Sequence, residues 1–387
     1  MGERAEIHDL KSSWATVGHR RPPLPHRGTS KVSCLPMATH ETCWFDAHLD
    51  LAMMAALGRD MAAQPAEAGG PDLPASITLP SLAAGCVRTC LGTIFTEAGG
   101  SDRRIGYPHG DAHAAFTVGT RQLQIYCQWA DAGWCRLPTA TVSAAVKVTV
   151  PCAAQGLRVG ILIEGADIIR EPVELAWWAG YGVVAVGLAW WTASRYAGGN
   201  GTPPGDPRTG ITPLGRELVA EMDRLGLVHD ASHLSDRAFA DLLEATGRTV
   251  IASHSNCRAL MGDVGNQRHL TDGQIKAIAG RGGVIGLNLY SRFLDAGCDK
   301  GGRTSIATAL RHVEHICELT GSRDHVGLGT DADGGFSAAR LPEGIDTPSD
   351  YGKLCEGLRG MGWNDEAVSK FVTGNFARVF PGLLGLD

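Results

Sequence analysis

From residue 44 onward, short apolar runs alternate with amphipathic stretches along the chain. The apolar runs are nearly continuous and rich in Val, Ile, Leu and Gly, which is typical of parallel strands buried on both faces. Eight such runs predict strands at residues 44–51, 87–95, 158–163, 182–189, 227–233, 249–254, 283–289 and 325–330.

The stretches between these runs carry helix signals. Residues 214–225 follow Thr212-Pro213, residues 235–245 begin with Ser-Asp, and residues 305–319 end before a glycine. Each is a favoured way to begin or end a helix. Further helical patterns cover residues 112–132 and 271–279.

About eight strands that alternate with helices predict the α/β class and a (β/α)₈ TIM-like barrel with extra helices. A doubly wound open sheet is the alternative, but no Gly-x-Gly-x-x-Gly follows the first strand. Two long connections, at residues 96–154 and 194–208, interrupt the alternation. The second follows the fourth strand, where a barrel places its active-site loops.

Residues 1–40 have no apolar periodicity and are rich in Pro, Arg, His and Ser. This composition predicts a disordered N-terminal extension, followed by a single domain over residues 41–387. Met37 lies just before the first strand and is an alternative start of the chain. The N-terminus has no apolar core typical of a secretory signal.

The net charge of −6 gives no basic field that would attract nucleic acid or anionic lipid. We therefore expect a small-molecule partner. No apolar run reaches the roughly 18 residues of a transmembrane segment. The 11 cysteines are scattered and include no Cys-x-x-Cys pair, which favours free thiols and a cytoplasmic location.

Polar, titratable residues stand at the ends of five predicted strands. His48 and Asp50 are two apart at the end of the first, so on a strand both would share one face. Each residue alone could have a structural role, such as capping a helix or bonding within the core. The carboxyl ends of barrel strands converge on one face, however, where these side chains would bury charge unless a metal neutralised it. The set is His48, Asp50, Glu164, His233, His254 and Asp331.

These residue types suit a two-metal hydrolytic site. Imidazole-rich ligation favours zinc, and Glu164 could give one oxygen to each of two Zn²⁺ ions. Ions about 3.5–4 Å apart can share a hydroxide and stabilise a tetrahedral intermediate. Asp331 could then hold or relay a proton.

The chain resembles the membrane (renal) dipeptidases, zinc metallopeptidases of the amidohydrolase superfamily, over residues 45–380. The resemblance rests on Asp46-Ala47-His48-Leu49-Asp50, Ile163-Glu164-Gly165, Ser232-His233, Ser253-His254-Ser255 and Gly329-Thr330-Asp331-Ala332-Asp333-Gly334. It implies one zinc on His48, Asp50 and Glu164, and a second on Glu164, His233 and His254. It also implies that Arg268 binds the substrate carboxylate, and it suggests a homodimer.

Five positions depart from the family pattern. Ala189 stands at the end of the fourth strand, where the family has a histidine that contacts the scissile carbonyl, and two tryptophans follow it. His269 replaces an asparagine, and Asp167 replaces a histidine that follows the bridging glutamate. Arg195, in the loop after the fourth strand, is a candidate to take over the role of the missing histidine.

The leading hypothesis is therefore a cytoplasmic binuclear zinc dipeptidase that cleaves a small dipeptide through a metal-bridging hydroxide, with Asp331 as proton shuttle. One alternative is a zinc amidohydrolase for another amide, such as an N-acyl amino acid. A second alternative is a barrel that holds metal and binds ligand without turnover, although Asp331 argues against it. The third is a barrel whose polar strand ends are only structural.

Overall fold

The computed structural model describes residues 43–138, 156–203, 205–262, 267–298 and 301–385. The predicted N-terminal extension, residues 1–40, lies outside them. The assignment of residues 41–387 to a single domain stays a prediction.

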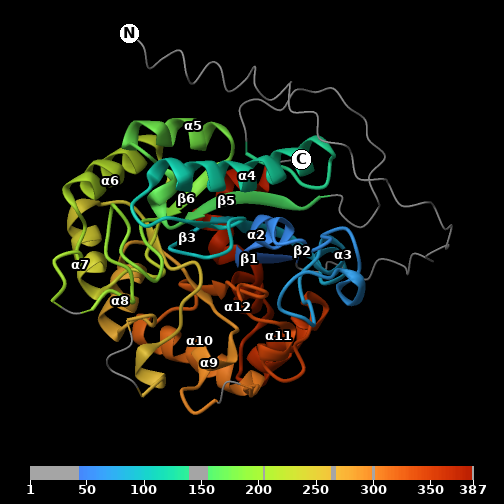
Figure 1. Ribbon diagram of the computed structural model, residues 1–387. Coiled ribbons are helices and arrows are strands. Elements are labelled where there is room, and N and C mark those ends of the chain that lie inside the picture. The colour runs from blue at the N-terminus through green and yellow to red at the C-terminus, as the bar shows by residue number, and fades with distance from the viewer. Residues whose placement is uncertain (1–42, 139–155, 204, 263–266, 299–300, 386–387) are drawn as a thin grey trace, which may run out of the picture. The chain divides into compact units, whose positions relative to one another are not determined.

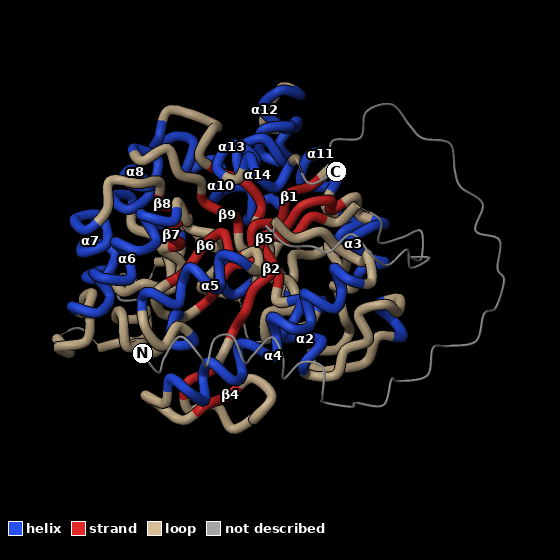
Figure 2. The backbone as a smooth tube through the Cα atoms, turned by 90° about the horizontal axis from the view of Figure 1, so that it is seen from above, coloured by secondary structure: helices blue, strands red, loops and turns tan. Residues whose placement is uncertain are grey.

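Eight parallel strands form one sheet whose order is β8-β7-β6-β5-β2-β1-β10-β9. Every neighbouring pair is parallel, which requires a crossover connection between successive strands. In Figures 1 and 2 the strands gather in the middle and the helices surround them. The strands are β1 (Trp44–Leu49), β2 (Val87–Phe95), β5 (Arg158–Glu164), β6 (Val183–Gly187), β7 (Val228–Asp230), β8 (Val250–Ile251), β9 (Ile285–Leu287) and β10 (Val326–Leu328). A separate parallel pair joins β3 (Glu97–Ala98) and β4 (Gly106–Tyr107).

The sheet closes on itself between β8 and β9. Ala252, just beyond β8, forms an isolated parallel bridge with Ile285. Its amide donates to the Val284 carbonyl at 3.1 Å, and its carbonyl accepts from the Gly286 amide at 2.8 Å. The result is a nearly closed eight-stranded barrel, so the predicted (β/α)₈ fold is confirmed and the open sheet is excluded.

The helices begin where the sequence signals predicted. Thr212, Ser235 and Ser305 each accept a hydrogen bond from a backbone amide in the first turn. No helix of the described residues is long and apolar enough to cross a bilayer. The helices are α2 (Leu51–Ala56), α3 (Leu79–Ala84), α4 (Ala112–Asp131), α5 (Leu175–Gly180), α6 (Pro213–Leu225), α7 (Asp236–Ala245), α8 (Asp272–Gly280), α9 (Ser291–Leu294), α10 (Ile306–Thr320), α11 (Gly352–Gly360), α12 (Asp365–Ser369), α13 (Asn375–Val379) and α14 (Pro381–Leu384).

Two apolar layers build the core. The large outer layer lies between the strands and the helices. The inner layer contains inward-facing strand residues together with side chains of the C-terminal helices. Side chains alternate along a strand, so a residue two positions after an inner-layer residue on the same strand also points into the barrel, toward its mouth. The buried members of the inner layer are Phe45, Ala47, Leu91, Leu162, Ala185, Ile251, Val284, Phe376, Phe380 and Leu383.

Several strands are shorter than predicted. The apolar patterns at residues 227–233 and 249–254 give only Val228–Asp230 and Val250–Ile251 as strand. The residues that follow are buried, so their apolar character reflects packing in loops at the barrel mouth rather than pairing. His233, His254 and Asp331 therefore reach the mouth from loops.

Candidate metal centre

Glu164 is the last residue of β5. Leu162, two positions earlier, belongs to the inner layer, so strand alternation points Glu164 into the barrel mouth. His48 is near the end of β1, where the pairing with β2 shifts register between Asp46 and Leu49. Asp50 lies beyond the strand, at the N-cap position of α2. The two residues thus reach one site from a strand and a helix start, not from one strand face.

Two of the loop residues adopt an uncommon backbone conformation. His233 has φ of 64° and Asp331 has φ of 58°, in the left-handed region that non-glycine residues rarely occupy. Such strain is often found at functional sites. A Cβ atom on Gly334 would lie 2.1 Å from Asp331 Oδ1, so only glycine permits this loop to pack against the aspartate.

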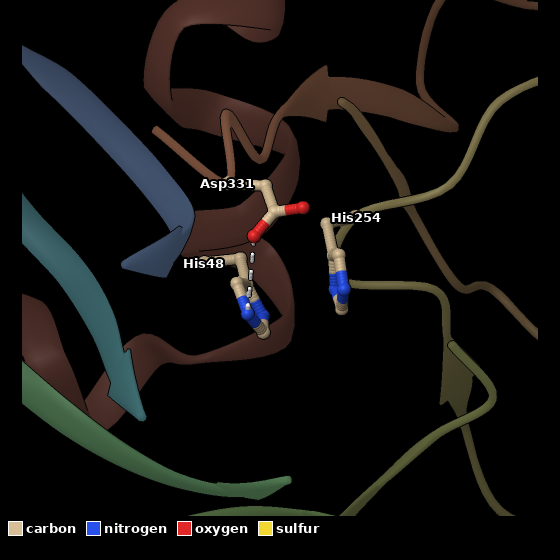
Figure 3. A group of neighbouring side chains, drawn as sticks. All are labelled: His48, His254 and Asp331. Carbon is tan, nitrogen blue, oxygen red and sulfur yellow. Dashed lines mark ion pairs between the residues drawn. The ribbon is translucent and has the colours of Figure 1, made fainter. Parts of the chain in front are cut away.

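The predicted residues converge in three overlapping groups. Within each group, one ligand atom per residue lies within 4.8 Å of the others. Two of the groups share Glu164, and the third places Asp331 beside two histidines (Figure 3). The groups are His48, Asp50 and Glu164; Glu164, His233 and His254; and His48, His254 and Asp331.

The donor set of the first group fits a metal cation. His48 Nε2 is buried and has no hydrogen-bond partner among the described residues. It faces carboxylate oxygens of Glu164 at 3.4 Å, Asp331 at 3.9 Å and Asp50 at 4.0 Å. Burial lowers the pKa of His48, but these carboxylates, chiefly Glu164, overcome that effect and raise the pKa to about 10. A site that attracts a proton so strongly would also attract a divalent cation.

The second group fits a metal as well. His233 Nε2 and His254 Nε2 lie 2.9 Å apart, and Glu164 Oε1 lies 3.1 Å from His233 Nε2. His233 Nδ1 lies 2.9 Å from Asn200 Oδ1, an acceptor that requires the proton on Nδ1. His233 Nε2 then carries a lone pair. Burial lowers the pKa of His233 to about 4, so the ring stays neutral, as metal ligation needs.

The two central carboxyl groups have opposite pKa shifts. Burial raises the pKa of Glu164, but His48 and His233 outweigh it and hold the pKa below its usual range. Burial raises the pKa of Asp331 to about 7. Asn288 donates from Nδ2 to Asp331 Oδ2 at 2.9 Å and fixes the carboxyl orientation.

A cavity of about 380 Å³ opens onto Asp50, Glu164, His233 and Asp331. Its wall contains Trp190, whose ring lies 4.8 Å from that of Phe95 and 6.0 Å from that of His233. The other lining residues are mostly apolar or aromatic, with two further carboxylates: Met53, Leu57, Asp72, Phe95, Glu97, Ile105, Tyr290, Phe293, Gly334, Gly335 and Phe336. This cavity suits a small ligand with an apolar part.

Arg268 lies beside the metal groups. Its guanidinium donates to the His254 carbonyl at 2.9 Å and to Ser255 Oγ at 3.2 Å, and it lies 5.0 Å from the centre of the Phe293 ring. It is 4% exposed. Arg268 itself does not line the cavity, but Phe293, against which its guanidinium lies, does.

The two other predicted substrate contacts lie elsewhere. Ala189 is buried, and the following residue, Trp190, is the one that lines the cavity. Arg195 lines a different, more open groove and donates from its guanidinium to the Arg170 carbonyl at 2.9 Å. The structure therefore does not bring Arg195 to the metal groups.

The remaining departures from the family pattern have structural partners. Asp167 accepts hydrogen bonds from Tyr107 Oη at 2.7 Å and from the Arg195 amide at 2.8 Å. His269 packs its ring edge-on against Phe293, with centroids 5.3 Å apart. Neither residue is among the candidate metal ligands.

Sequence reasoning missed several side chains that orient the candidate ligands. Thr93 donates to Asp50 Oδ1, Asn200 bonds His233, and Asn288 bonds Asp331. A histidine ligand commonly needs a partner for its other nitrogen, but a sequence does not show which distant residue supplies it. One signal in the sequence could have indicated Asn200. It lies in the glycine-rich loop at residues 198–201, which follows a barrel strand and therefore lies where a barrel places its active-site loops.

Comparisons with known proteins bear on the identity of this site. A family model described as membrane dipeptidase (peptidase family M19) matches residues 37–383. A protein from Klebsiella pneumoniae, "Uncharacterized protein in pqqA 5'region", is 34% identical over 225 residues, which are 57% of this chain and 80% of that protein. Dipeptidase 3 of Rattus norvegicus is 31% identical over 172 residues, 44% of this chain, and the match spans only 33% of the rat protein.

Two solved structures share the fold over almost their entire length. "Dipeptidase AC", a metallopeptidase of family M19, has a TM-score of 0.71 and 26% identity and covers 89% of this chain and 100% of its own. A metallopeptidase from Rhodobacter sphaeroides, solved with a phosphinate mimic of the dipeptide L-Ala-D-Ala, has a TM-score of 0.71 and 25% identity over 88% of this chain and 99% of its own. Because the family model covers most of the chain, this protein belongs to the membrane dipeptidase family, peptidase family M19.

Proposed function

We propose that this protein is a binuclear zinc dipeptidase that hydrolyses the amide bond of a small dipeptide. The observation that carries the proposal is the pair of ligand groups that share Glu164 at the barrel mouth. One group adds His48 and Asp50, and the other adds His233 and His254. Membership of the dipeptidase family supports zinc as the metal and a dipeptide as the substrate.

Bound zinc would supply Lewis acidity and a water acidic enough to lose its proton near neutral pH. The chain's own residues would do the rest. Arg268 would bind the substrate carboxylate, and the apolar cavity wall would hold the side chains and exclude water. Asp331 would accept a proton from the water and give it to the leaving amine.

The test is metal analysis of the purified full-length protein, combined with a hydrolysis screen of dipeptides and N-acyl amino acids. We expect close to two zinc ions per chain and turnover of dipeptides. A protein that takes up no divalent ion after incubation with zinc would refute the mechanism. Metal uptake without turnover of any compound would favour a binding protein.

A second candidate function is hydrolysis of another amide, such as an N-acyl amino acid. Trp190 favours it, because its indole lies in the cavity wall close to His233. A bulky apolar group there suits an acyl chain better than a charged amino terminus. A cytoplasmic location and a homodimer are also part of our proposal; the first rests on the sequence and the second on the family resemblance.

Arg268 leads to a prediction about the charge of the substrate. If its guanidinium pairs with a free carboxylate, a dipeptide amide should be a far poorer substrate than the free acid. Losing a charge-assisted hydrogen bond costs about 1.5–3 kcal/mol, or roughly tenfold to a hundredfold in kcat/KM. Arg268→Ala should remove the preference for the acid. Equal kcat/KM for acid and amide with the unaltered protein would contradict the assignment.

Ala189→His tests whether the missing histidine limits dipeptide hydrolysis. A donor that stabilises a developing oxyanion contributes about 10²–10³ in kcat. If the pocket is otherwise built for dipeptides, kcat on simple dipeptides should rise. We expect no rise, because Trp190 fills the cavity wall next to this position, and we expect activity on the true substrate to fall. Arg195→Ala is the matched control and should be silent, since Arg195 lines another groove. A clear gain in dipeptide turnover would overturn this expectation.

A further inference from the structure

One serine hydroxyl reaches a histidine of each ligand group. Ser253 Oγ lies 2.8 Å from His254 Nδ1 and 3.3 Å from His48 Nδ1. It also donates to Asp230 Oδ2 at 2.5 Å. The imidazoles themselves lie nearly face to face, with centroids 3.5 Å apart and planes inclined by 30° (Figure 3). Both rings therefore present the same edge to one hydroxyl.

Asp230 is a buried carboxylate surrounded by donors. It is the last residue of β7 and is 3% exposed. Its Oδ1 accepts from the Ser232 amide at 3.0 Å and from the Ser253 amide at 2.9 Å. With Oδ1 occupied by backbone amides, Oδ2 is the oxygen that receives the serine hydroxyl.

Proton counting then decides the state of both histidines. A hydroxyl has one hydrogen and two lone pairs, whereas a carboxylate has only acceptors. Since the hydrogen of Ser253 goes to Asp230, the hydroxyl can only accept from the two imidazoles. Each imidazole must then carry a hydrogen on Nδ1, which leaves Nε2 as the ring nitrogen available to a metal.

We propose that Asp230 and Ser253 are positioning residues that jointly set one metal ligand in each of the two groups. Through one hydroxyl they hold His48 and His254 in the Nδ1–H tautomer, with both Nε2 atoms ready for metal. The proposal rests on the two-metal site of the proposed function. It links the sites chemically, because a change at Asp230 alters a ligand of both.

The barrel holds Ser253 rigidly. Ser253 is fully buried, and its carbonyl oxygen lies 1.8 Å from where a Cβ would stand on either Gly286 or Gly329. Bare backbone on β9 and after β10 therefore packs directly against this residue. A hydroxyl on so constrained a backbone can fix the direction of the rings that bond to it.

Ser232 is the remaining neighbour of this hydroxyl. Its Oγ lies 3.3 Å from Ser253 Oγ and accepts from the His254 amide at 3.2 Å. It bonds the backbone of a ligand and contacts no imidazole nitrogen at hydrogen-bond distance. Ser232→Ala is therefore a matched control for Ser253→Ala, since both variants remove one buried hydroxyl from the same cluster.

The decisive variant is Asp230→Asn, which keeps the shape of the side chain. If the amide nitrogen takes the place of Oδ2, it donates to Ser253 Oγ, so the hydroxyl can accept from only one of the two imidazoles. Its own hydrogen then turns to the other imidazole Nδ1 or to Ser232 Oγ. In both cases one histidine loses its acceptor, and a histidine that receives the serine hydrogen must protonate Nε2 and lose its metal lone pair. The opposite orientation of the amide would place NH₂ against two backbone amides, which are also donors. Either orientation breaks the network.

We expect Asp230→Asn and Ser253→Ala to weaken Zn²⁺ binding by about 10–100-fold, the usual effect of losing a group that orients a metal ligand. The measurement is competition between the full-length protein and a chromophoric chelator. Ser232→Ala should keep its zinc affinity within a few-fold. Asp46→Asn is a second control, because Asp46 is also buried and accepts from Thr330 Oγ1 at 2.6 Å and from the His48 amide at 3.2 Å, so it bonds the backbone of a ligand and not an imidazole nitrogen. It should lose stability but keep zinc.

Nitrogen-15 NMR of the imidazoles in metal-free protein gives an independent readout. We expect both His48 and His254 to carry a hydrogen on Nδ1 in the unaltered protein, and at least one of them to lose that hydrogen in Asp230→Asn. Unaltered zinc affinity in Asp230→Asn and Ser253→Ala, or a ring without a hydrogen on Nδ1 in the unaltered protein, would overturn the proposal. A wild-type protein that binds no zinc would instead defeat the proposed function, and the NMR result would still decide the tautomers.

Discussion

Glu164→Gln is expected to leave the protein with less than one zinc ion per chain and without measurable hydrolysis. Glu164 belongs to both ligand groups and lies within 3.5 Å of Nε2 on His48, His233 and His254. A glutamine loses the charge, and its NH₂ group cannot bind a cation. Breaking a buried charge pair costs about 3–5 kcal/mol, which weakens metal binding at least about 100-fold. Metal analysis after dialysis measures the loss.

Asp167→Asn is the matched control for this experiment. Asp167 is buried and lies three residues after Glu164, and its substitution by asparagine removes the same charge. Its hydrogen-bond partners, however, are Tyr107 and the Arg195 amide. We expect this variant to keep its zinc. Full zinc content in Glu164→Gln, or equal losses in the two variants, would show that Glu164 does not bridge the ions.

Asp331→Asn is expected to lower kcat by about 10²–10⁴ while both zinc ions stay bound, since proton transfer by a side chain contributes about that factor. Asparagine keeps the shape of the side chain and can retain one contact with Asn288. It cannot accept and release a proton. The measurement is kcat on the best substrate, with metal content determined on the same sample.

Metal content decides between two roles for Asp331. Its carboxylate also forms a group with His48 and His254, so it could serve as a ligand. Loss of zinc in Asp331→Asn would assign it that role and contradict the proton shuttle. Asp333→Asn is the control for the loop: Asp333 is buried and paired with Arg59. That variant should melt at a lower temperature with a much smaller fall in kcat.

The barrel and its candidate ligands could be predicted because both depend on local patterns. Continuous apolar runs mark buried parallel strands, and their carboxyl ends must meet at one face of a barrel. The position of Glu164 follows from alternation along β5, where Leu162 faces the interior. No knowledge of loop conformation was needed for these steps.

The partners of the ligands could not be predicted for the opposite reason. Asn200 bonds a histidine 33 residues away, and Ser253 bonds one that is 205 residues away. Such contacts depend on how loops turn, as the left-handed backbone of His233 illustrates. The position of Arg195 after the fourth strand suits the barrel mouth, but its side chain turns toward Arg170.

Neighbouring strands of the barrel pair over very different lengths. β2 and β5 pair over seven register positions, whereas β7 and β8 pair over two and an isolated bridge closes the seam to β9. Glu164 lies at the end of a strand with extensive pairing, whereas His233 and His254 follow the two strands that pair over only two positions. An ion bound by all three residues would link the extensively paired part of the barrel to the part with little pairing. We therefore expect the part of the barrel around β7, β8 and β9 to open first when metal is removed. The two metal sites would then exchange their ions with solvent at different rates.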